Sequence, residues 1–96
     1  MANNSAARKV IVLNPAGLHA RPSLAVVQAV RGSQSKVEVR TRGLTVDAGD
    51  ILQLLGLGAV QGSELVFSAS GPDADKILDT LTDLFANRFG LCGEPD

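Results

Sequence analysis

Asn14-Pro15-Ala16-Gly17-Leu18-His19-Ala20-Arg21-Pro22 is the stretch in which a predicted strand ends and a predicted helix begins. Asn14, Pro15 and Gly17 are typical turn residues, and they follow a β-branched run at residues 9–13 that favours a strand. Pro22 suits the first turn of a helix, where its missing N–H has no intrahelical partner to lose. His19, the only histidine of the chain, therefore lies at the mouth of a helix predicted over residues 20–31.

Hydrophobic periodicity predicts the elements that follow. Val37 and Val39 alternate with charged residues, which indicates a half-buried strand over residues 36–41. Arg42-Gly43 is typical of a hairpin turn, and a short return strand is expected over residues 44–47.

Asp50 is expected to start a short helix that ends at Gly56 and Gly58. Asp is a favourable N-cap, and Gln53, three residues later, completes a capping-box pattern. The last strand is predicted over residues 64–70. The last helix is predicted to start at Gly71-Pro72-Asp73 and to be closed by Gly90, with an apolar stripe of Ile77, Leu78, Leu81, Leu84, Phe85 and Phe89.

The predicted order of elements is β-α-β-β-α-β-α, which indicates an α+β fold. A four-stranded antiparallel sheet covered on one face by three helices satisfies the layer rule for a chain of this size. We expect residues 1–96 to form one domain with a core of about residues 8–90 and flexible termini at residues 1–7 and 91–96. Periodicity leaves open whether Val10 and Val12 or their neighbours Ile11 and Leu13 point inward.

Composition excludes several classes of function. The formal net charge of the 96 residues is -1, and a nucleic-acid partner would require a concentrated basic face. The most apolar run, residues 51–60, is far shorter than the ~20 residues of a membrane helix and contains Gln53, so no membrane insertion is expected. Cys92 is the only cysteine, which fits a reducing compartment, and we expect a cytoplasmic protein.

His19 is the leading candidate for chemistry. A lone histidine is commonly a surface or structural residue, but a helix mouth presents unpaired backbone N–H groups, here those of Ala20 and Arg21, that suit an anion. The guanidinium of Arg21 is close enough in sequence to bind the same anion, and a neutral imidazole is a nucleophile near neutral pH. These residues predict a histidine that accepts a phosphoryl group and gives it up again.

Other catalytic arrangements are weaker. One histidine and one cysteine are too few for a zinc site built from those residues, so no metal and no cofactor are expected. Gly56-Leu57-Gly58 lacks the rest of a dinucleotide fingerprint. A small hydrolase that uses Ser23 or Cys92 remains a minor alternative.

Two blocks of sequence resemble the histidine-containing phosphocarrier family, HPr, of the bacterial sugar phosphotransferase system. The first is Gly17-Leu18-His19-Ala20-Arg21-Pro22, and the second is Val46-Asp47-Ala48-Gly49-Asp50-Ile51-Leu52, followed by Leu57-Gly58. The resemblance covers about residues 8–90. It implies the open-faced β-sandwich of that family, with the same order of elements.

The resemblance also implies roles for individual residues. By this resemblance, His19 would receive a phosphoryl group on Nδ1 from enzyme I and pass it to IIA domains, and Arg21 would assist the transfer. The protein would be a covalent relay without turnover of its own, and a monomer. The docking surface for its partners is implied to include Leu24, Arg31, Ile51, Leu52 and Leu55.

Two departures from the family pattern bear on regulation. Asp50 occupies the position of a serine that a dedicated kinase phosphorylates in many relatives. Gln28 and Gln53 occupy positions where several relatives carry lysines, so Arg31 is the basic residue that remains on that side. A second hypothesis is therefore a regulatory module of the same fold, whose phosphorylation state controls docking to a kinase, a transcriptional regulator or a metabolic enzyme without sugar transport.

Overall fold

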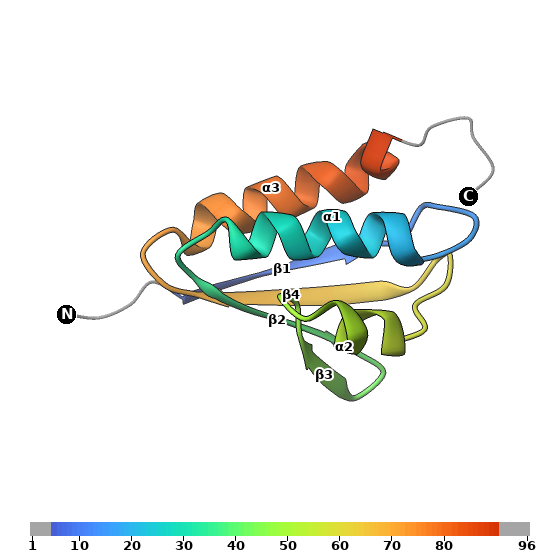
Figure 1. Ribbon diagram of the computed structural model, residues 1–96, viewed down its shortest axis with the longest axis horizontal. Coiled ribbons are helices and arrows are strands. Elements are labelled where there is room, and N and C mark those ends of the chain that lie inside the picture. The colour runs from blue at the N-terminus through green and yellow to red at the C-terminus, as the bar shows by residue number, and fades with distance from the viewer. Residues whose placement is uncertain (1–4, 91–96) are drawn as a thin grey trace.

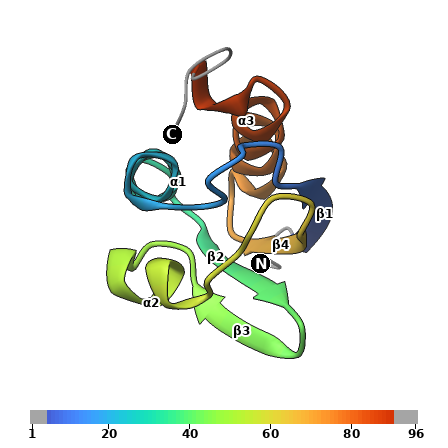
Figure 2. The same ribbon diagram turned by 90° about the vertical axis from the view of Figure 1, so that its right-hand side faces the viewer.

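The computed structural model describes residues 5–90 and contains one antiparallel sheet with three helices on one face (Figures 1 and 2). The strands are β1 (Ser5–Ile11), β2 (Lys36–Thr41), β3 (Leu44–Asp47) and β4 (Glu64–Ser70), and they lie in the order β1-β4-β2-β3. The helices are α1 (Ala20–Arg31), α2 (Ile51–Gly56) and α3 (Ala74–Ala86), followed by the 3-10 turn η1 (Arg88–Gly90). The predicted α+β fold and order of elements are confirmed.

The first strand begins earlier than predicted. β1 starts at Ser5, so the expectation of a flexible terminus is wrong for residues 5–7, and the strand ends at Ile11 rather than at residue 13. Ser5 pairs with Ser70 and Ile11 pairs with Glu64, which makes β1 the antiparallel neighbour of β4 along its whole length. Strand pairing uses backbone groups, and therefore it extends into a segment that is not apolar. Residues 1–4 and 91–96, including Cys92, lie outside the described residues.

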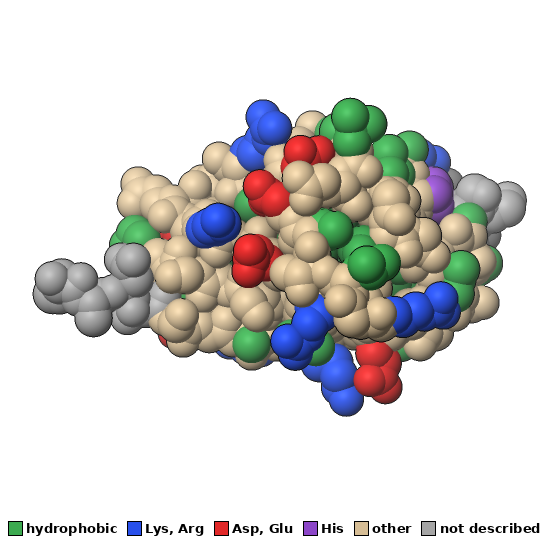
Figure 3. Space-filling model, turned by 90° about the horizontal axis from the view of Figure 1, so that it is seen from below, with side chains coloured by type: hydrophobic (Ala, Val, Ile, Leu, Met, Phe, Trp, Pro, Cys, Tyr) green, Lys and Arg blue, Asp and Glu red, His purple; other side chains and the backbone are tan. Residues whose placement is uncertain are grey.

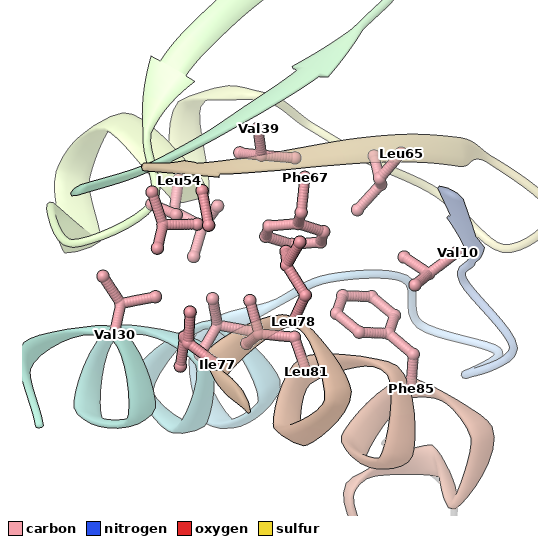
Figure 4. Close-up of a cluster of buried hydrophobic side chains, with 14 of the residues drawn as sticks. Val10, Val30, Val39, Leu54, Leu65, Phe67, Ile77, Leu78, Leu81 and Phe85 are labelled. Carbon is pink, nitrogen blue, oxygen red and sulfur yellow. The ribbon is translucent and has the colours of Figure 1, made fainter. Parts of the chain in front are cut away.

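The core lies between the sheet and the helices (Figure 4). Val10 and Val12 point inward, and Ile11 and Leu13 are exposed, which settles the alternative that periodicity left open. Phe67 of β4 is fully buried and its ring centroid lies 5.5 Å from that of Phe85 of α3. Each large apolar side chain buried in this way contributes roughly 1.5–3 kcal/mol to folding.

The last helix is shorter than predicted. α3 ends at Ala86, and the chain then turns through three successive residues with positive φ: Arg88 at 52°, Phe89 at 56° and Gly90 at 76°. The ring of Phe89 nevertheless reaches the core, because it packs edge-on against Phe85 at a centroid distance of 4.7 Å. The apolar stripe therefore continues past the helix through a left-handed turn.

Asp73 ties together two loops where α3 starts, and in Figure 1 the start of α3 lies at the end of the molecule opposite the start of α1, which follows His19. Asp73 is the N-cap residue of α3, but its carboxylate does not cap that helix. It accepts hydrogen bonds from the backbone N–H of Gln34 and the hydroxyl of Ser35 instead. The hydrogen bond from the Ser35 hydroxyl, and after it that from the Gln34 N–H, lowers the pKa of Asp73 below its ordinary value. The loop before β2 is thus held against the start of α3.

The hairpin between β2 and β3 turns at Arg42 and Gly43. Arg42 and Gly43 have φ values of 51° and 80°, which is the primed turn that a two-residue hairpin favours. Within residues 5–90, no helix has both the length and the apolar character that crossing a membrane requires.

Candidate functional site

His19 is the N-cap residue of α1. Its backbone is extended, with φ -87° and ψ -160°, and its carbonyl accepts the N–H of Ser23 at 3.0 Å. Because Pro22 has no N–H and that of Ser23 is already bonded, the backbone donors left at this helix end are those of Ala20 and Arg21. The ring is half-buried, and its Nε2 atom is buried. An anion bound on the side of the ring away from Nε2 would therefore lie near these two N–H groups and near the positive end of the helix dipole.

Arg21 lies on the first turn of α1, two residues after His19. Its side chain is exposed, and it makes no ion pair and no side-chain hydrogen bond with any residue in the range 5–90. A guanidinium in this state keeps all its donors for a ligand, and it binds phosphate oxygens in pairs.

The loop of residues 12–19, which we call the histidine loop, is fixed by its neighbours. Leu18 donates its N–H to the carbonyl of Ala59 at 2.9 Å, and Gly17 donates its N–H to the backbone carbonyl of Asn14 at 2.9 Å. Gly17 has a φ of 76°, and a Cβ at this position would lie 2.4 Å from the Ala59 oxygen. Residue 17 is glycine both for its backbone conformation and for this close approach.

Ser23 anchors the histidine loop to α1. Its side chain is fully buried, and its hydroxyl donates to the carbonyl of Leu18 at 3.1 Å. The hydroxyl is therefore turned toward the loop backbone and away from the surface, which removes the basis for a hydrolase that uses Ser23 as its nucleophile.

Exposed apolar side chains of α1 and α2 form a patch near the histidine, which we call the apolar patch. Its members are Leu24 of α1 and Leu52 and Leu55 of α2, and Leu52 is 77% exposed. Ile51, also expected on this surface, is half-buried and packs against the core. Figure 3, a view from below, shows several hydrophobic side chains toward the upper right of the molecule and the histidine near its right-hand side. Exposed apolar surface of this kind is typical of a protein-docking face.

Asp50 is the N-cap of α2, as the sequence predicts. Its Oδ1 accepts the N–H groups of Leu52 at 3.0 Å and Gln53 at 3.2 Å. The capping box is modified, because the Gln53 side chain donates to Asp50 and accepts from the N–H of Asp47 instead of that of Asp50. The carboxylate of Asp50 is thus engaged by its own helix.

Metal ligands are not gathered in the described part of the chain. Among residues 5–90, no three His, Cys, Asp or Glu side chains lie close enough together to hold a metal ion. The chemistry available at the end of α1 is that of His19, Arg21 and the first-turn amides.

The comparisons with known proteins agree with this geometry. A family model described as "PTS HPr component phosphorylation site" matches residues 6–87. The chain belongs to the HPr family. HPr proteins are phosphocarrier components of the phosphotransferase system rather than enzymes in the usual sense.

Relatives of the HPr family resemble the chain over most of its length. The phosphocarrier protein HPr of Cupriavidus necator is 37% identical over 83 residues, which are 86% of this chain and 93% of the relative. That of Treponema pallidum is 38% identical over 82 residues, covering 85% and 93%. The crystal structure of HPr from Thermoanaerobacter tengcongensis has a TM-score of 0.85 at 32% identity and covers 88% of this chain and 96% of its own. Crh, described as the Bacillus subtilis catabolite repression HPr, has a TM-score of 0.63 at 31% identity, covering 83% and 95%.

The structure brings most of the predicted HPr site residues to one region. His19, Ala20 and Arg21 share the first turn of α1, and the apolar patch extends from α1 to α2. Arg31 lies at the other end of α1, where its Nε donates to the carbonyl of Gly49 at 3.0 Å.

Sequence reasoning missed Asn14, a residue of the histidine loop whose side chain the structure buries. Its side chain is 2% exposed, and its Nδ2 donates to the carbonyl of Arg88 at 3.2 Å. In the sequence, Asn14 has only the signature of a turn residue, and a contact 74 residues away gives no local signal.

Proposed function

We propose that this protein is a phosphocarrier that accepts a phosphoryl group on Nδ1 of His19 from phosphorylated enzyme I and passes it to IIA-type acceptor domains. The observation that carries the proposal is the position of His19 as the N-cap of α1, beside the donors of Ala20 and Arg21, in a chain of the HPr family. We propose that it acts as a cytoplasmic monomer.

The proposed transfer is a displacement at phosphorus. The lone pair of Nδ1 attacks the phosphorus atom, the bond between phosphorus and the donor group breaks, and the bonding electrons stay with the donor. Burial of Nε2 supports Nδ1 as the nucleophile. The same displacement, with an acceptor nucleophile attacking phospho-His19, returns the ring to its starting state.

The dianionic phosphoryl group is stabilised by charge and by hydrogen bonds. The N–H groups of Ala20 and Arg21 and the guanidinium of Arg21 are donors at the end of the helix where its dipole favours negative charge. None of these groups has to be taken from an ion pair with another described residue, so they are ready when the phosphoryl group arrives.

Partners are proposed to dock over the apolar patch beside His19. Leu24, Leu52 and Leu55 supply apolar area, and Arg31 supplies the positive charge at its border. Because Gln28 and Gln53 are uncharged, electrostatic steering of an acidic partner is expected to be modest.

A regulatory role is the second candidate. Its support is Asp50 at the position of the regulatory serine, together with the structural likeness to Crh, whose description refers to catabolite repression. On this proposal, the phosphorylation state of His19 controls docking to a kinase, a transcriptional regulator or a metabolic enzyme, and no sugar is transported.

The deciding experiment is phosphotransfer from phosphoenolpyruvate with the enzyme I and IIA proteins of the same organism. We expect label on this protein that is stable in base and labile in acid, is absent from His19→Ala, and moves to a IIA protein when one is added. Arg21→Ala is expected to slow labelling, whereas Arg42→Ala, which changes an arginine of the distant hairpin, leaves it unchanged.

Two results separate the candidates. Label that persists in His19→Ala, or no label in the wild-type protein, contradicts the phosphocarrier proposal. Labelling without transfer to any IIA protein, combined with failure to restore sugar uptake in a strain that lacks its own HPr, favours the regulatory module.

A further inference from the structure

Within residues 5–90, three parts of the chain form hydrogen bonds with the histidine loop. The segment of residues 59–63 bonds the backbone of Val12 and Leu18, and Ser23 of α1 bonds the carbonyl of Leu18. The third part is the left-handed turn η1, and among residues 5–90 its one hydrogen bond to the loop is that from Asn14 Nδ2 to Arg88.

Asn14 occupies the turn that leads to His19. Its carbonyl accepts the N–H of Gly17, and the tightly packed Gly17 is followed directly by Leu18 and His19. The backbone between Asn14 and His19 is short and constrained, so a displacement of Asn14 is expected to displace His19 as well. The side chain of Asn14 reaches the other way, and its Nδ2 donates to the carbonyl of Arg88 at 3.2 Å.

The turn η1 is in a conformation that its surroundings must enforce. Arg88 and Phe89 are not glycines, yet both have positive φ, and such residues persist where other contacts determine the backbone. Phe89 is held by its edge-on contact with Phe85 in the core. The carbonyl that Asn14 binds is thus presented by a strained turn fixed to α3.

Stability alone does not explain why residue 14 is an asparagine. Its Oδ1 is buried and has no hydrogen-bond donor among the described residues. A buried acceptor in this state reduces stability, and an apolar side chain would avoid that cost.

We propose that Asn14 is a positioning residue: its amide ties the histidine loop to the Arg88–Gly90 turn, and this link fixes the orientation in which His19 meets a phosphoryl donor. The inference rests on the proposed function for its effect on phosphotransfer. Its effect on the orientation of the ring is independent of that function.

The test uses Asn14→Leu in the full chain, with phosphoramidate as a small phosphoryl donor that needs no docking surface. The P–N bond of phosphoramidate breaks as His19 attacks, and ammonia leaves. We expect labelling to fall by about tenfold, because small misplacements of a reacting group cost one to two orders of magnitude in rate. The His19 ring ¹⁵N resonances are expected to shift, whereas the midpoint of urea denaturation does not fall.

Phe89→Ala supplies a second variant that leaves Asn14 in place. It frees η1 from Phe85, so the same slowing and the same ring shifts are expected, and the double variant is expected to be no slower than either single variant. Ser35→Ala is the matched control, because it removes a hydrogen bond between two loops at the opposite end of the molecule and should leave the labelling rate and the ring unchanged.

Unchanged ring resonances and labelling rate in folded Asn14→Leu overturn the inference. So does a double variant whose defect is the product of the two single defects. Failure of the wild-type protein to accept phosphate from enzyme I overturns the proposed function instead, and it leaves the ring measurement as the test of the link.

Discussion

Arg31 Nε donates a hydrogen bond to the carbonyl of Gly49 at 3.0 Å, which joins the last turn of α1 to the loop that leads into α2. Leu24 lies on the first of these helices, and Leu52 and Leu55 lie on the second. Arg31 therefore contributes to the relative placement of the two halves of the apolar patch, in addition to the charge expected from it.

Replacing Arg31 separates these two contributions. Arg31→Met removes both charge and hydrogen bond, and Arg31→Lys keeps the charge but has no donor at the Nε position. We expect both variants to lose about 0.5–1 kcal/mol of unfolding free energy. This loss lies in the lower part of the range for a hydrogen bond, because the site is exposed. Enzyme I binding is expected to fall further in Arg31→Met than in Arg31→Lys. Equal unfolding free energies of the wild-type protein and both variants in urea would show that this hydrogen bond does not stabilise the fold.

Gly17→Ala is predicted to be one of the most damaging single substitutions in the chain. The new Cβ would lie 2.4 Å from the Ala59 oxygen and would also meet an unfavourable φ of 76°. Gly43→Ala is the matched control, since Gly43 has a φ of 80° and no atom within 4 Å of the added Cβ. We expect a loss of about 1 kcal/mol for Gly43→Ala from φ alone and about 3 kcal/mol or more for Gly17→Ala, measured by urea denaturation. Similar losses in the two variants would contradict the close approach.

Leu52→Asp tests the apolar patch without disturbing the core. Leu52 is 77% exposed, so its replacement is expected to change stability by less than about 0.5 kcal/mol. Binding to enzyme I, measured by calorimetry, is expected to weaken by about tenfold or more, as for a residue at the centre of an interface. Leu44→Asp is the control, because Leu44 is 55% exposed but lies on β3, away from the patch. Equal weakening by the two variants would exclude the patch as the specific docking site.

The lowered pKa of Asp73 predicts a change of stability with pH. Because the folded pKa lies below the unfolded value, the contribution is complete above about pH 4, the ordinary carboxyl value, and it is lost as pH falls through the lower folded pKa. Ser35→Ala removes the largest cause of the lowered pKa, so its unfolding free energy should fall less steeply than that of the wild-type protein at acid pH. Parallel pH profiles would show that Ser35 does not set this pKa. The Asp73 resonance, followed by NMR through the same titration, measures the pKa directly.

The sequence predicts most of the fold because its periodicities are strong. The bounds of α1, β2, β3 and β4 agree with the pattern of apolar residues. The start of β1 is different: Ser5, Ala6 and Ala7 carry no strand pattern, and their conformation depends on β4, which lies some sixty residues later in the chain. The end of α3 is missed for the opposite reason, since Phe89 continues the helical stripe while its backbone has left the helix.

The residues of the candidate site also fall into those that the sequence predicts and those that it does not. His19, Arg21 and Asp50 are visible in the sequence because their roles depend on local spacing at the start of a helix. Asn14 is not, because its side chain binds a residue that only the tertiary fold brings near. Outside the site, the contacts of Asp73 at the opposite end of the molecule are missed for the same reason. Residues whose role depends on their sequence neighbours can thus be predicted from the sequence. Residues that hold the site in place through distant contacts are identified only in the folded structure.

The pairing of the first strand with the last has a consequence for synthesis of the chain. β1 cannot find its partner until residue 70 has left the ribosome, and the carbonyl that Asn14 binds belongs to residue 88. The hairpin of β2 and β3 and the helix α1 involve near neighbours and can form while the chain is still growing. His19 is thus among the early residues to be made, but the loop that holds it is completed only when nearly the whole chain is available. A nascent or truncated chain therefore carries the histidine without the surroundings that make it an acceptor.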